Sequence, residues 1–497
     1  MKIKIDELMA RSGVKFGTSG TRGLVVDMTD KVCFAYVVAF LQQQITQGRI
    51  AVGDRVGIAG DLRSSTDRIM NAVAAACVHC GFLPLNYGYI PSPALALFGL
   101  NANMATIMVT GSHIPDDRNG IKFNSPLGEI LHADEVGIRS QLVELPAALF
   151  NSDDSLKEGG FLPAISREAH DYYLRRYLDF LPEKCLQGKT IGLYEHSAVT
   201  RECLKTLLHE LGASVVSLGR SDKFISVDTE AIRPEDIALA REWSQAHSFD
   251  AIVSTDGDGD RPLISDEHGE WLRGDIAGIL CAQFLGADTV ITPVSSNSAV
   301  EQNLFARVIR TKIGSPYVIE AMQLAAETEG QKVVGYEANG GFLQQSPLEK
   351  YNRILAPLPT RDAVIVILSV MLLAQHEQKN ISELVATLPQ RFTASDRIKN
   401  FLNSHSKNLL EHLVSQGKLN HIAVTNLLPD FTEPVALDLT DGVRIVFDNN
   451  EVVHFRPSGN APELRCYTEA DSQRRAEDIN RQALAAVFRW QEQQVQG

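Results

Sequence analysis

The sequence has 497 residues, of which 44% are hydrophobic and 22% charged, and its formal net charge at pH 7 is −14. A chain of this length exceeds one ordinary hydrophobic core, so we expect about three domains, and the composition is that of a globular protein that folds throughout. The negative charge disfavours nucleic acid or an anionic membrane as the main partner, because both require a basic protein face. A small anionic substrate remains compatible if basic residues gather locally.

The first residues lack the apolar core of a signal peptide, and no apolar run approaches the roughly 20 residues that cross a bilayer. We therefore expect a cytoplasmic protein. The seven cysteines are scattered, and Cys77 and Cys80, although spaced as CxxC, lie in an alanine-rich apolar segment. Reduced thiols in the core are the expected state.

Helical and strand patterns alternate along the first 150 residues, which is typical of an α/β layer. The predicted elements are a helix over 30–44, a strand over 55–59, a helix over 64–80 and a strand over 105–109. A second unit follows, with strands over 190–194, 213–218 and 250–254 and a helix over 198–211.

A third run passes from a strand over 289–291 through 295–308 to 332–335 and an apolar helix over 361–375. After Pro389 the pattern changes to polar helix, short strands such as 443–447 and a last helix over 471–491, which indicates a smaller α+β domain. The predicted domains are 1–150, 151–265, 266–385 and 386–497.

The loop at 110–122, TGSHIPDDRNGIK, follows a predicted strand, and such loops commonly bind ligands in α/β proteins. Gly111 permits unusual backbone angles and the pair Asn119–Gly120 predicts a turn, so Ser112 is expected on a shaped loop. A serine beside His113 also fits an ordinary polar loop, and no Ser/His/Asp catalytic order can be assigned.

The loop at 254–261, STDGDGDR, offers three carboxylates at alternate positions, from Asp256, Asp258 and Asp260. Three oxygen donors of this kind suit a hard divalent cation, magnesium first. A solvated acidic turn is the alternative, but three uncompensated carboxylates would repel one another. An EF-hand is disfavoured, because Arg261 and Pro262 do not fit its ligand pattern.

Two further loops carry polar groups. In GYEANGG at 335–341, Glu337 and Asn339 can bind vicinal sugar hydroxyls, although a plain tight turn has the same composition. In FRPSGNAPELR at 455–465, two guanidinium groups flank a hydroxyl and a glycine, which indicates a phosphate cradle or, alternatively, a surface turn with ordinary ion pairs. The loops at 15–23 and 61–65 are expected to form walls of an anion site.

Together these loops resemble those of the α-D-phosphohexomutase family, whose members carry GTxGxRG, TASHNP…NGxK, DGDxDR, GExSG and RxSGTEP motifs in this order. The counterparts extend from Lys15 to Arg465. The resemblance implies an α/β protein of four domains around a central cleft. Three are related α/β domains with mixed sheets, and the fourth is a smaller C-terminal α+β domain that binds phosphate.

The resemblance also implies a role for individual residues. Ser112 corresponds to the phosphoserine, and a Mg²⁺ ion is held by Ser112, Asp256, Asp258 and Asp260. The catalytic site is further lined by Arg22, His113, Lys122 and Arg261. The substrate-binding residues are Glu337, Asn339, Arg456, Ser458, Gly459, Asn460 and Arg465.

The sequence departs from the family pattern at several places. Four replacements are expected to alter contacts without deleting the reaction: Gly111, Ile114, Asn460 and Ala461. In the sugar loop, Gly341 stands where many members have a histidine that is sometimes assigned proton transfer. The general base cannot be carried over, and Lys122 is the leading substitute.

The implied activity interconverts hexose 1-phosphate and hexose 6-phosphate through a phosphoserine and a bound 1,6-bisphosphate, which also serves as activator. Mannose phosphate is the favoured substrate, with glucose phosphate next, because the loop at 337–339 does not match the glutamate-glutamine-serine loop of the glucosamine enzymes. We expect no nucleic-acid or membrane partner, and a monomer or homodimer. A magnesium-dependent sugar phosphatase and a non-catalytic sugar-phosphate sensor are the alternatives.

Overall fold

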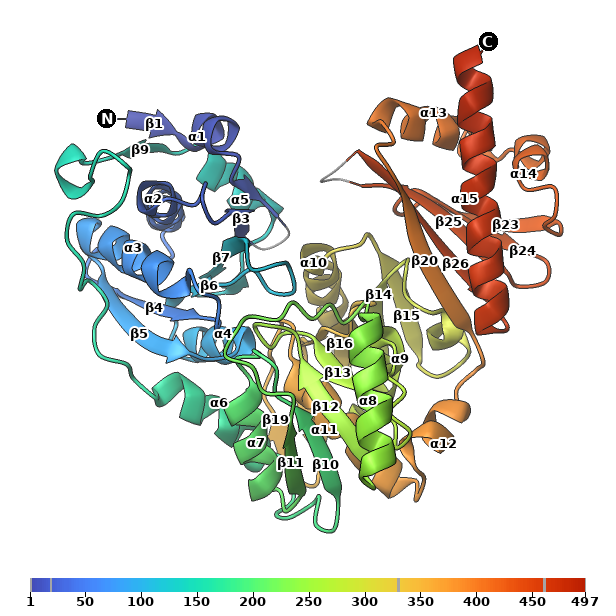
Figure 1. The fold of residues 1–497 in the computed structure, drawn as a ribbon, viewed down its shortest axis with the longest axis horizontal. Coiled ribbons are helices and arrows are strands. Elements are labelled where there is room, and N and C mark those ends of the chain that lie inside the picture. Colours follow the sequence, from blue (N-terminus) through green and yellow to red (C-terminus); the bar gives the residue numbers. More distant parts are fainter. Residues whose placement is uncertain (1, 18–19, 329–330, 459–461, 497) are drawn as a thin grey trace. The chain divides into compact units, whose positions relative to one another are not determined.

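The structure is a computed structural model that describes residues 2–17, 20–328, 331–458 and 462–496. Its packing divides the chain into two compact units. Unit 1 comprises Met1–Val290 with Gly314–Leu384, and unit 2 comprises Ile291–Ile313 with Val385–Gly497. The chain therefore passes between the units three times, and the colours of Figure 1 trace its course from the N-terminus to the C-terminus. Strand β14 (Thr289–Pro293) and helix α12 (Ile381–Ala386) span the divisions.

The first layer of unit 1 is a mixed sheet with the strand order β2-β3-β7-β6-β4-β5. Strand β4 is parallel to β5 and β6, whereas β7 is antiparallel to β6. The bounds are Lys15–Phe16 (β2), Gly20–Leu24 (β3), Arg55–Gly60 (β4), Leu83–Tyr89 (β5), Ala105–Val109 (β6) and Arg118–Ser125 (β7). The carboxyl ends of β4 and β6 meet at one edge of the sheet, where ligand-binding loops are expected.

Helices cover both sides of this sheet. In Figure 1, α2 (Asp30–Thr46) and α3 (Thr66–His79) lie on one side and α4 (Ser92–Asn101) on the other. Helix α2 begins where the Thr29 side chain accepts a hydrogen bond from the Val32 N–H at 3.3 Å. Its residues 32–41 are all buried, as expected of a helix that is apolar on every side. Shorter elements are β1 (Lys2–Lys4), α1 (Ile5–Ser12), β8 (Gly128–Glu129), α5 (His132–Arg139) and β9 (Leu142–Glu144).

The second layer of unit 1 is a four-stranded sheet with the order β11-β10-β12-β13. Strand β10 is parallel to β11 and β12, and β13 is antiparallel to β12. The bounds are Thr190–Tyr194 (β10), Ser214–Leu218 (β11), Ala251–Thr255 (β12), Pro262–Ile264 (β13), Glu168–Leu178 (α6), Arg201–Glu210 (α7) and Pro234–Ala246 (α8). The tight connection between β12 and β13 contains the acidic loop.

The remainder of unit 1 contains two packed apolar helices, α9 (Gly274–Leu285) and α11 (Ala363–His376), together with α10 (Ser315–Ala326). Strand β16 (Val333–Tyr336) pairs antiparallel with β17 (Phe342–Gln344), and β18 (Leu348–Lys350) pairs with β19 (Arg353–Leu355). The turn between β16 and β17 carries Glu337 and Asn339.

Unit 2 is built on an antiparallel sheet with the order β20-β26-β25-β24-β23 and one face packed against α15. The bounds are Phe392–Lys399 (β20), Pro434–Asp438 (β23), Val443–Phe447 (β24), Val452–Pro457 (β25), Glu463–Ala470 (β26) and Gln473–Gln496 (α15). Smaller elements are η2 (Ser298–Glu301), β15 (Arg307–Thr311), α13 (Asn403–Leu413), β21 (Val414–Ser415), β22 (Lys418–Leu419) and α14 (His421–Leu427).

Strands predicted over 105–109, 190–194 and 443–447 have these bounds in the structure. The turn predicted at Asn119–Gly120 is wrong, because both residues lie within β7. A Cβ on Gly120 would lie 2.5 Å from the Thr21 carbonyl oxygen and 2.7 Å from that of Thr110. Glycine is needed there because neighbouring backbones approach closely.

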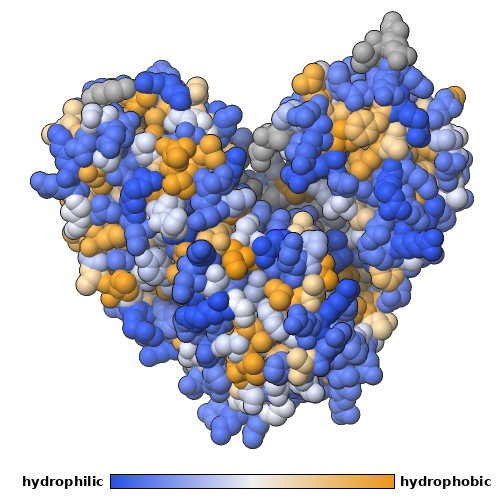
Figure 2. Space-filling view, in the orientation of Figure 1, coloured by the Kyte–Doolittle hydropathy of each residue, from blue (hydrophilic) through white to orange (hydrophobic). Residues whose placement is uncertain are grey.

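The cysteines agree with the expected reduced thiols, since none of those in the described residues forms a disulfide and most are buried. Among the described helices, none has the combination of length and apolar character that crossing a membrane requires. On the face seen in Figure 2, hydrophobic residues occur in small patches among hydrophilic ones.

Candidate active site

Ser112 lies directly beyond the carboxyl end of β6 with a left-handed backbone angle, φ of 54°. Its side chain is buried, with 1% exposure, and its Oγ donates a hydrogen bond to Asp256 Oδ2 at 2.6 Å. The Ser112 N–H donates to the Thr110 hydroxyl at 2.7 Å. A non-glycine residue in this conformation is uncommon and clusters at functional sites. The backbone therefore aims the serine hydroxyl at the acidic loop.

Arg63 holds the serine loop from behind. Its guanidinium donates to the carbonyl oxygens of four loop residues at 2.6 to 2.9 Å: Ser112, Ile114, Pro115 and Arg118. A Cβ on Gly111 would lie 2.7 Å from Arg63 Cζ, and Gly111 has no positive φ. The expectation that Gly111 supplies unusual backbone angles is therefore wrong: Ser112 adopts them, and Gly111 makes room for Arg63.

His113 is a neutral imidazole beside the serine. Its Nδ1 lies 3.3 Å from Ser112 Oγ. Burial, and then the positive charges of Arg261 and Arg22, lower the pKa of His113 to about 2. The ring is therefore uncharged near neutral pH. Its Nδ1 donates a hydrogen bond to the serine oxygen or accepts one from it, depending on the tautomer.

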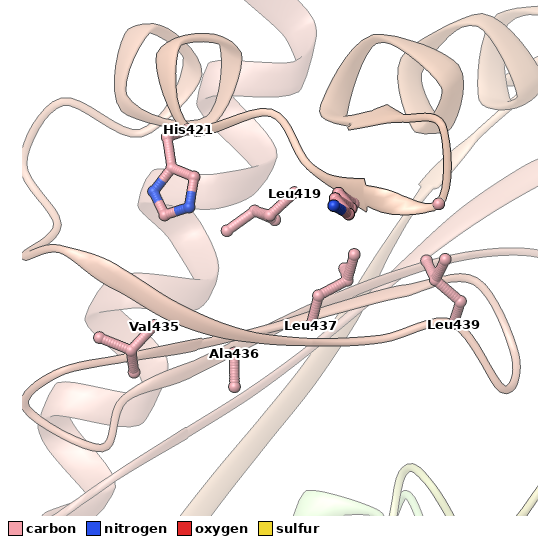
Figure 3. A pocket seen from close by; sticks show the side chains of 8 residues that line it. Leu419, His421, Val435, Ala436, Leu437 and Leu439 are labelled. Carbon is pink, nitrogen blue, oxygen red and sulfur yellow. The ribbon is translucent and has the colours of Figure 1, made fainter.

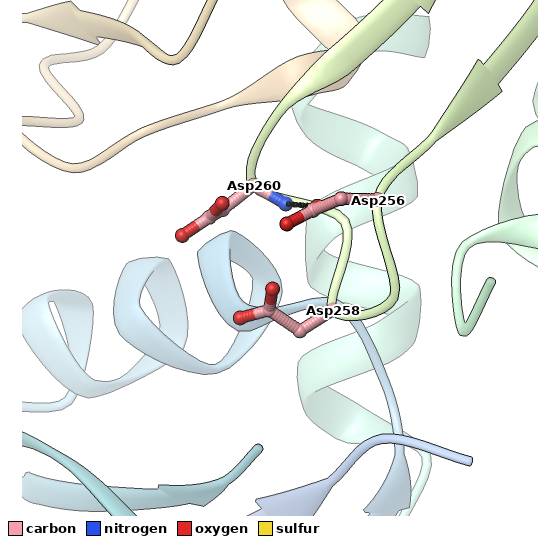
Figure 4. Close-up of side chains that lie close together, drawn as sticks. All are labelled: Asp256, Asp258 and Asp260. Atoms are coloured by element: carbon pink, nitrogen blue, oxygen red, sulfur yellow. Dashed lines mark hydrogen bonds between the residues drawn. The ribbon is translucent and has the colours of Figure 1, made fainter. Parts of the chain in front are cut away.

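The three aspartates of the acidic loop converge. Figure 4 shows their carboxylates pointing into one common space, and one oxygen of each lies within 4.8 Å of the others. Asp256 and Asp258 are fully buried and Asp260 is 2% exposed. Burial, followed by its two acidic neighbours, raises the pKa of Asp256 well above the usual range. Proximity of this kind is costly unless a cation offsets the charge.

The donor set fits a hard divalent cation. Within the described part of the chain, Asp258 Oδ1 and Asp260 Oδ1 are buried and have no hydrogen-bond partner. Buried carboxylate oxygens are normally satisfied, so these two are suited to coordinate a cation. All the available donors are oxygens from carboxylates and the Ser112 hydroxyl, which is the preference of Mg²⁺ or Ca²⁺.

Basic side chains surround the acidic loop. Lys122 Nζ donates to Asp258 Oδ2 and Asp260 Oδ2, each at 2.6 Å. Burial opposes the charge of Lys122, but the two carboxylates raise its pKa above the usual range, so it is an ammonium group. Burial and the neighbouring Arg261 and Arg361 lower the pKa of Arg22 to about 10, which still leaves it protonated. Positive charge is concentrated here although the chain is acidic overall.

The sugar-loop residues belong to the same unit. Glu337 is 5% exposed, and its Oε2 accepts a hydrogen bond from Arg361 Nη1 at 3.2 Å. Asn339 Oδ1 accepts from the Gly341 N–H at 2.9 Å, and its carbonyl oxygen accepts from the Thr229 hydroxyl at 2.8 Å. The Asn339 side chain therefore shapes the turn from within.

Unit 1 thus contains ten of the predicted residues: Arg22, Ser112, His113, Lys122, Asp256, Asp258, Asp260, Arg261, Glu337 and Asn339. Direct contacts join Ser112 and Lys122 to the acidic loop, and Arg361 joins that loop to Glu337. Sequence reasoning missed Arg361 and Ser92, whose hydroxyl donates to Asp258 Oδ2. The available sequence signal for Arg361 was its position just before an apolar helix. A charged residue beside a buried helix requires partners of opposite charge.

The predicted phosphate cradle lies in unit 2. Arg456 on β25 is directly opposite Arg465 on β26. Arg456 Nε donates to Asp441 Oδ2 at 2.7 Å, and Ser458 is 5% exposed. Two guanidinium groups therefore lie opposite each other on neighbouring strands, and such groups bind phosphate through charged hydrogen bonds. Gly459 and Asn460 lie outside the described residues.

His454, two residues before Arg456, supplies a pH-dependent contribution to stability. Its Nε2 donates to the Asp441 carbonyl oxygen at 2.6 Å, and burial lowers its pKa to about 4 from 6.5. The folded protein therefore binds this proton less readily than the unfolded chain, so His454 stabilises the fold fully above pH 6.5. That contribution is lost as the pH falls from 6.5 to 4 and amounts to about 3 kcal/mol.

We expect His454→Gln to flatten the fall in stability between pH 6.5 and 4. The measurement is the urea unfolding midpoint of each protein across this range, and the difference between the two curves removes the other titrating groups. Parallel curves would contradict the assignment.

A separate open pocket of about 450 Å³ lies in unit 2. Figure 3 shows Leu419 and His421 on one side and the β23 segment on the other. Its lining residues include none of the predicted site residues and are Gly417, Lys418, Leu419, His421, Val435, Ala436, Leu437 and Leu439.

Four family models match the chain in succession. They describe the phosphoglucomutase/phosphomannomutase α/β/α domain I at residues 13–145, domain II at 175–269, domain III at 273–392 and the C-terminal domain at 415–486.

Named proteins match over nearly the whole chain. A phosphomannomutase of Salmonella muenchen is 44% identical, covering 97% of both chains, and one of Sinorhizobium fredii is 42% identical, covering 96% of this chain and 99% of its own. A phosphoglucosamine mutase of Thermotoga neapolitana is 26% identical. A solved phosphoglucomutase/phosphomannomutase family protein from Burkholderia thailandensis has a TM-score of 0.72 at 19% identity, covering 95% of this chain and 97% of its own, which shows the shared fold.

Proposed function

Because this chain belongs to the phosphoglucomutase/phosphomannomutase family, we propose that it interconverts hexose 1-phosphate and hexose 6-phosphate, with mannose phosphate as substrate. The observation that carries the proposal is the 2.6 Å contact between Ser112 Oγ and Asp256 in a cation-type site. A phosphoryl group on that oxygen adjoins the three aspartates. Identity above 40% to two phosphomannomutases favours mannose over glucose phosphate, and the glucosamine enzymes are more distant.

In the proposed cycle, phosphorylated Ser112 transfers its phosphoryl group to the free hydroxyl of the hexose phosphate. The bond between phosphorus and Ser112 Oγ breaks and a bond to the sugar oxygen forms, while the proton of the sugar hydroxyl passes, directly or through a base, to the released serine oxygen. The resulting 1,6-bisphosphate reorients and returns its other phosphate to Ser112. The same bisphosphate, added in trace amounts, activates the unphosphorylated enzyme.

Asp256, Asp258 and Asp260, together with the Ser112 oxygen, would hold a Mg²⁺ ion, which would neutralise charge at the transferring group. Lys122 and Arg261 add positive charge at the same place. Lys122 begins as an ammonium, so it stabilises charge directly and must lose a proton before it can act as base. Neutral His113, whose Nδ1 lies 3.3 Å from Ser112 Oγ, is a second candidate for proton transfer.

The domain boundaries at 150, 265 and 385 belong to this proposal. The first domain carries the phosphoserine loop, the second the metal loop, the third the sugar loop and the fourth the phosphate cradle. A cytoplasmic location and a monomeric or homodimeric state are further predictions.

One assay tests the activity against its alternatives. Purified protein is incubated with Mg²⁺, trace hexose 1,6-bisphosphate and either mannose 1-phosphate or glucose 1-phosphate, and both 6-phosphate and free phosphate are measured. We expect 6-phosphate without phosphate release, formed faster from the mannose compound. Phosphate release alone would identify a phosphatase, and the absence of both products a sensor.

Arg456 is expected to serve both ends of the sugar, because one cradle must accept either phosphate as the intermediate reorients. Arg456→Met should therefore raise KM for the 1-phosphate and the 6-phosphate alike, by about tenfold to a hundredfold, through loss of charged hydrogen bonds. Forward and reverse kinetics measure the two constants. Arg475→Met, which removes an ion pair with Glu451 in the same unit, is the control. An effect in one direction only would contradict a shared cradle.

A further inference from the structure

The Arg361 side chain packs against Gly341, the position where many members of the family carry a histidine. Gly341 has no positive φ, in contrast to Gly340 with φ of 86°. A Cβ on Gly341 would lie 2.5 Å from Arg361 Cδ and 2.7 Å from its Cγ. Glycine is therefore required at 341 for space and not for backbone conformation.

The Arg361 guanidinium joins the acidic loop to the turn that carries Glu337. Its Nε donates to Asp260 Oδ2 at 3.0 Å, and its Nη1 donates to Glu337 Oε2 at 3.2 Å. The residue is 4% exposed, so both contacts are made out of water, where charged hydrogen bonds are strong. The planar guanidinium can hold two carboxylates at a fixed separation, which a lysine cannot do.

The backbone at Arg361 is itself fixed. The next residue, Asp362, donates its N–H to the Phe342 carbonyl oxygen at 2.9 Å and caps α11 through the Val364 N–H. The buried Asp362 carboxylate also accepts hydrogen bonds from the hydroxyls of Tyr173 and Tyr177 on α6. These contacts tie the segment to its surroundings on both sides, so the direction of the Arg361 side chain is set before any ligand binds.

Resting on the function proposed above, we propose that Arg361 is a positioning residue that fixes the sugar-binding carboxylate of Glu337 relative to the metal loop, with Gly341 providing its space. Glu337 is nearly buried, and without Arg361 its carboxylate loses a hydrogen-bond partner at 3.2 Å. A buried carboxylate without that partner is no longer held at its position. Binding of the sugar hydroxyls then weakens, while the phosphoryl-transfer groups around Ser112 remain.

A double-mutant cycle tests the coupling. Wild type, Arg361→Lys, Glu337→Gln and the double variant are compared by kcat, KM and the calorimetric Kd for mannose 1-phosphate and glucose 1-phosphate. We expect each single change to raise KM and Kd about tenfold, to narrow the preference between the two sugars, and to alter kcat less. The double variant should be no worse than either single one.

Multiplying effects in the double variant, or a loss confined to kcat, would overturn the proposal. Arg233→Lys is the control, because Arg233 pairs with Asp236 at the start of α8 in the same unit, and it should leave KM unchanged. If the wild-type protein binds the sugar phosphates without converting them, the mutase activity is refuted. The coupling between Arg361 and Glu337 can still be measured from the Kd values of the four proteins.

A second arm tests the steric claim without activity. Gly341→Ala should lower the thermal midpoint by several degrees in the wild-type background, because the methyl group meets Arg361. The same substitution should cost less in an Arg361→Ala background, where only the closer contacts with the arginine are relieved and Asn339 Oδ1 remains 3.1 Å from the new Cβ. Equal losses in the two backgrounds would overturn the assignment of Gly341.

Discussion

Replacing Ser112 with Ala is expected to lower mutase turnover by at least about a thousandfold, because the variant has no oxygen to carry the phosphoryl group. Alanine has a Cβ as serine does, so the strain of the left-handed backbone conformation, φ of 54° at Ser112, should be the same in the variant. The fold should survive, since the loop is held chiefly through backbone carbonyls by Arg63. Steady-state rates and mass spectrometry of the isolated protein, which should show no phosphorylated peptide around residue 112, check this.

Ser140→Ala is the matched control. Ser140 lies at the end of α5 in the same unit, and its hydroxyl donates only to the nearby Gly137 carbonyl oxygen among the described contacts. Its turnover should equal that of wild type. Turnover within a few fold of wild type in the Ser112→Ala protein would refute the phosphoserine mechanism.

The second large effect is the loss of activity on removal of divalent cations. Chelation should abolish turnover and Mg²⁺ should restore it, because the buried Asp258 and Asp260 Oδ1 atoms have no hydrogen-bond partner in the described structure and are suited to bind a cation. Asp258→Asn should need Mg²⁺ at a concentration at least about a hundredfold higher, since an amide is neutral and a weaker ligand. The measurement is turnover against Mg²⁺ concentration, with direct titration of Mg²⁺ by calorimetry.

Asp250→Asn is the control for this prediction. Asp250 lies just before β12, at the opposite end from the acidic loop, and pairs with Lys189 at 2.8 Å. Its Mg²⁺ requirement should match that of wild type. Full activity after exhaustive chelation would contradict the metal assignment.

The fold class predicted from sequence is confirmed, with three α/β/α domains on mixed sheets and a C-terminal domain. Strands were the easiest to place, because runs such as Ala105–Val109 are wholly buried and end at turn residues. The Asn119–Gly120 turn failed because a glycine required for close strand approach looks the same in sequence as a turn glycine.

The candidate site was predictable where chemistry is local and not where it depends on packing. Alternating aspartates indicate a metal from the local sequence alone, whereas Ser112 is identified as a phosphate carrier only through the order of all the loops and their resemblance to the family. The Arg361 contact with Glu337 and Asp260 spans residues that are far apart in sequence and has no local pattern. Gly111 and Gly341 were noticed as departures, but only the structure relates each to an arginine that occupies the missing side chain's space.

Because the chain passes between the units three times, each unit is made of two separate segments, and a fragment with one segment is an incomplete unit. A fragment starting at residue 386 would omit 291–313, which packs with the C-terminal sheet. It would lose the Ile313 N–H that donates to Asp441, the Asn297 amide that donates to the Arg391 carbonyl oxygen, and the Ser298 contact with Glu469. Because Asp441 also holds Arg456, such a truncation would remove support from the cradle itself, and a gene fragment encoding this unit must include both segments.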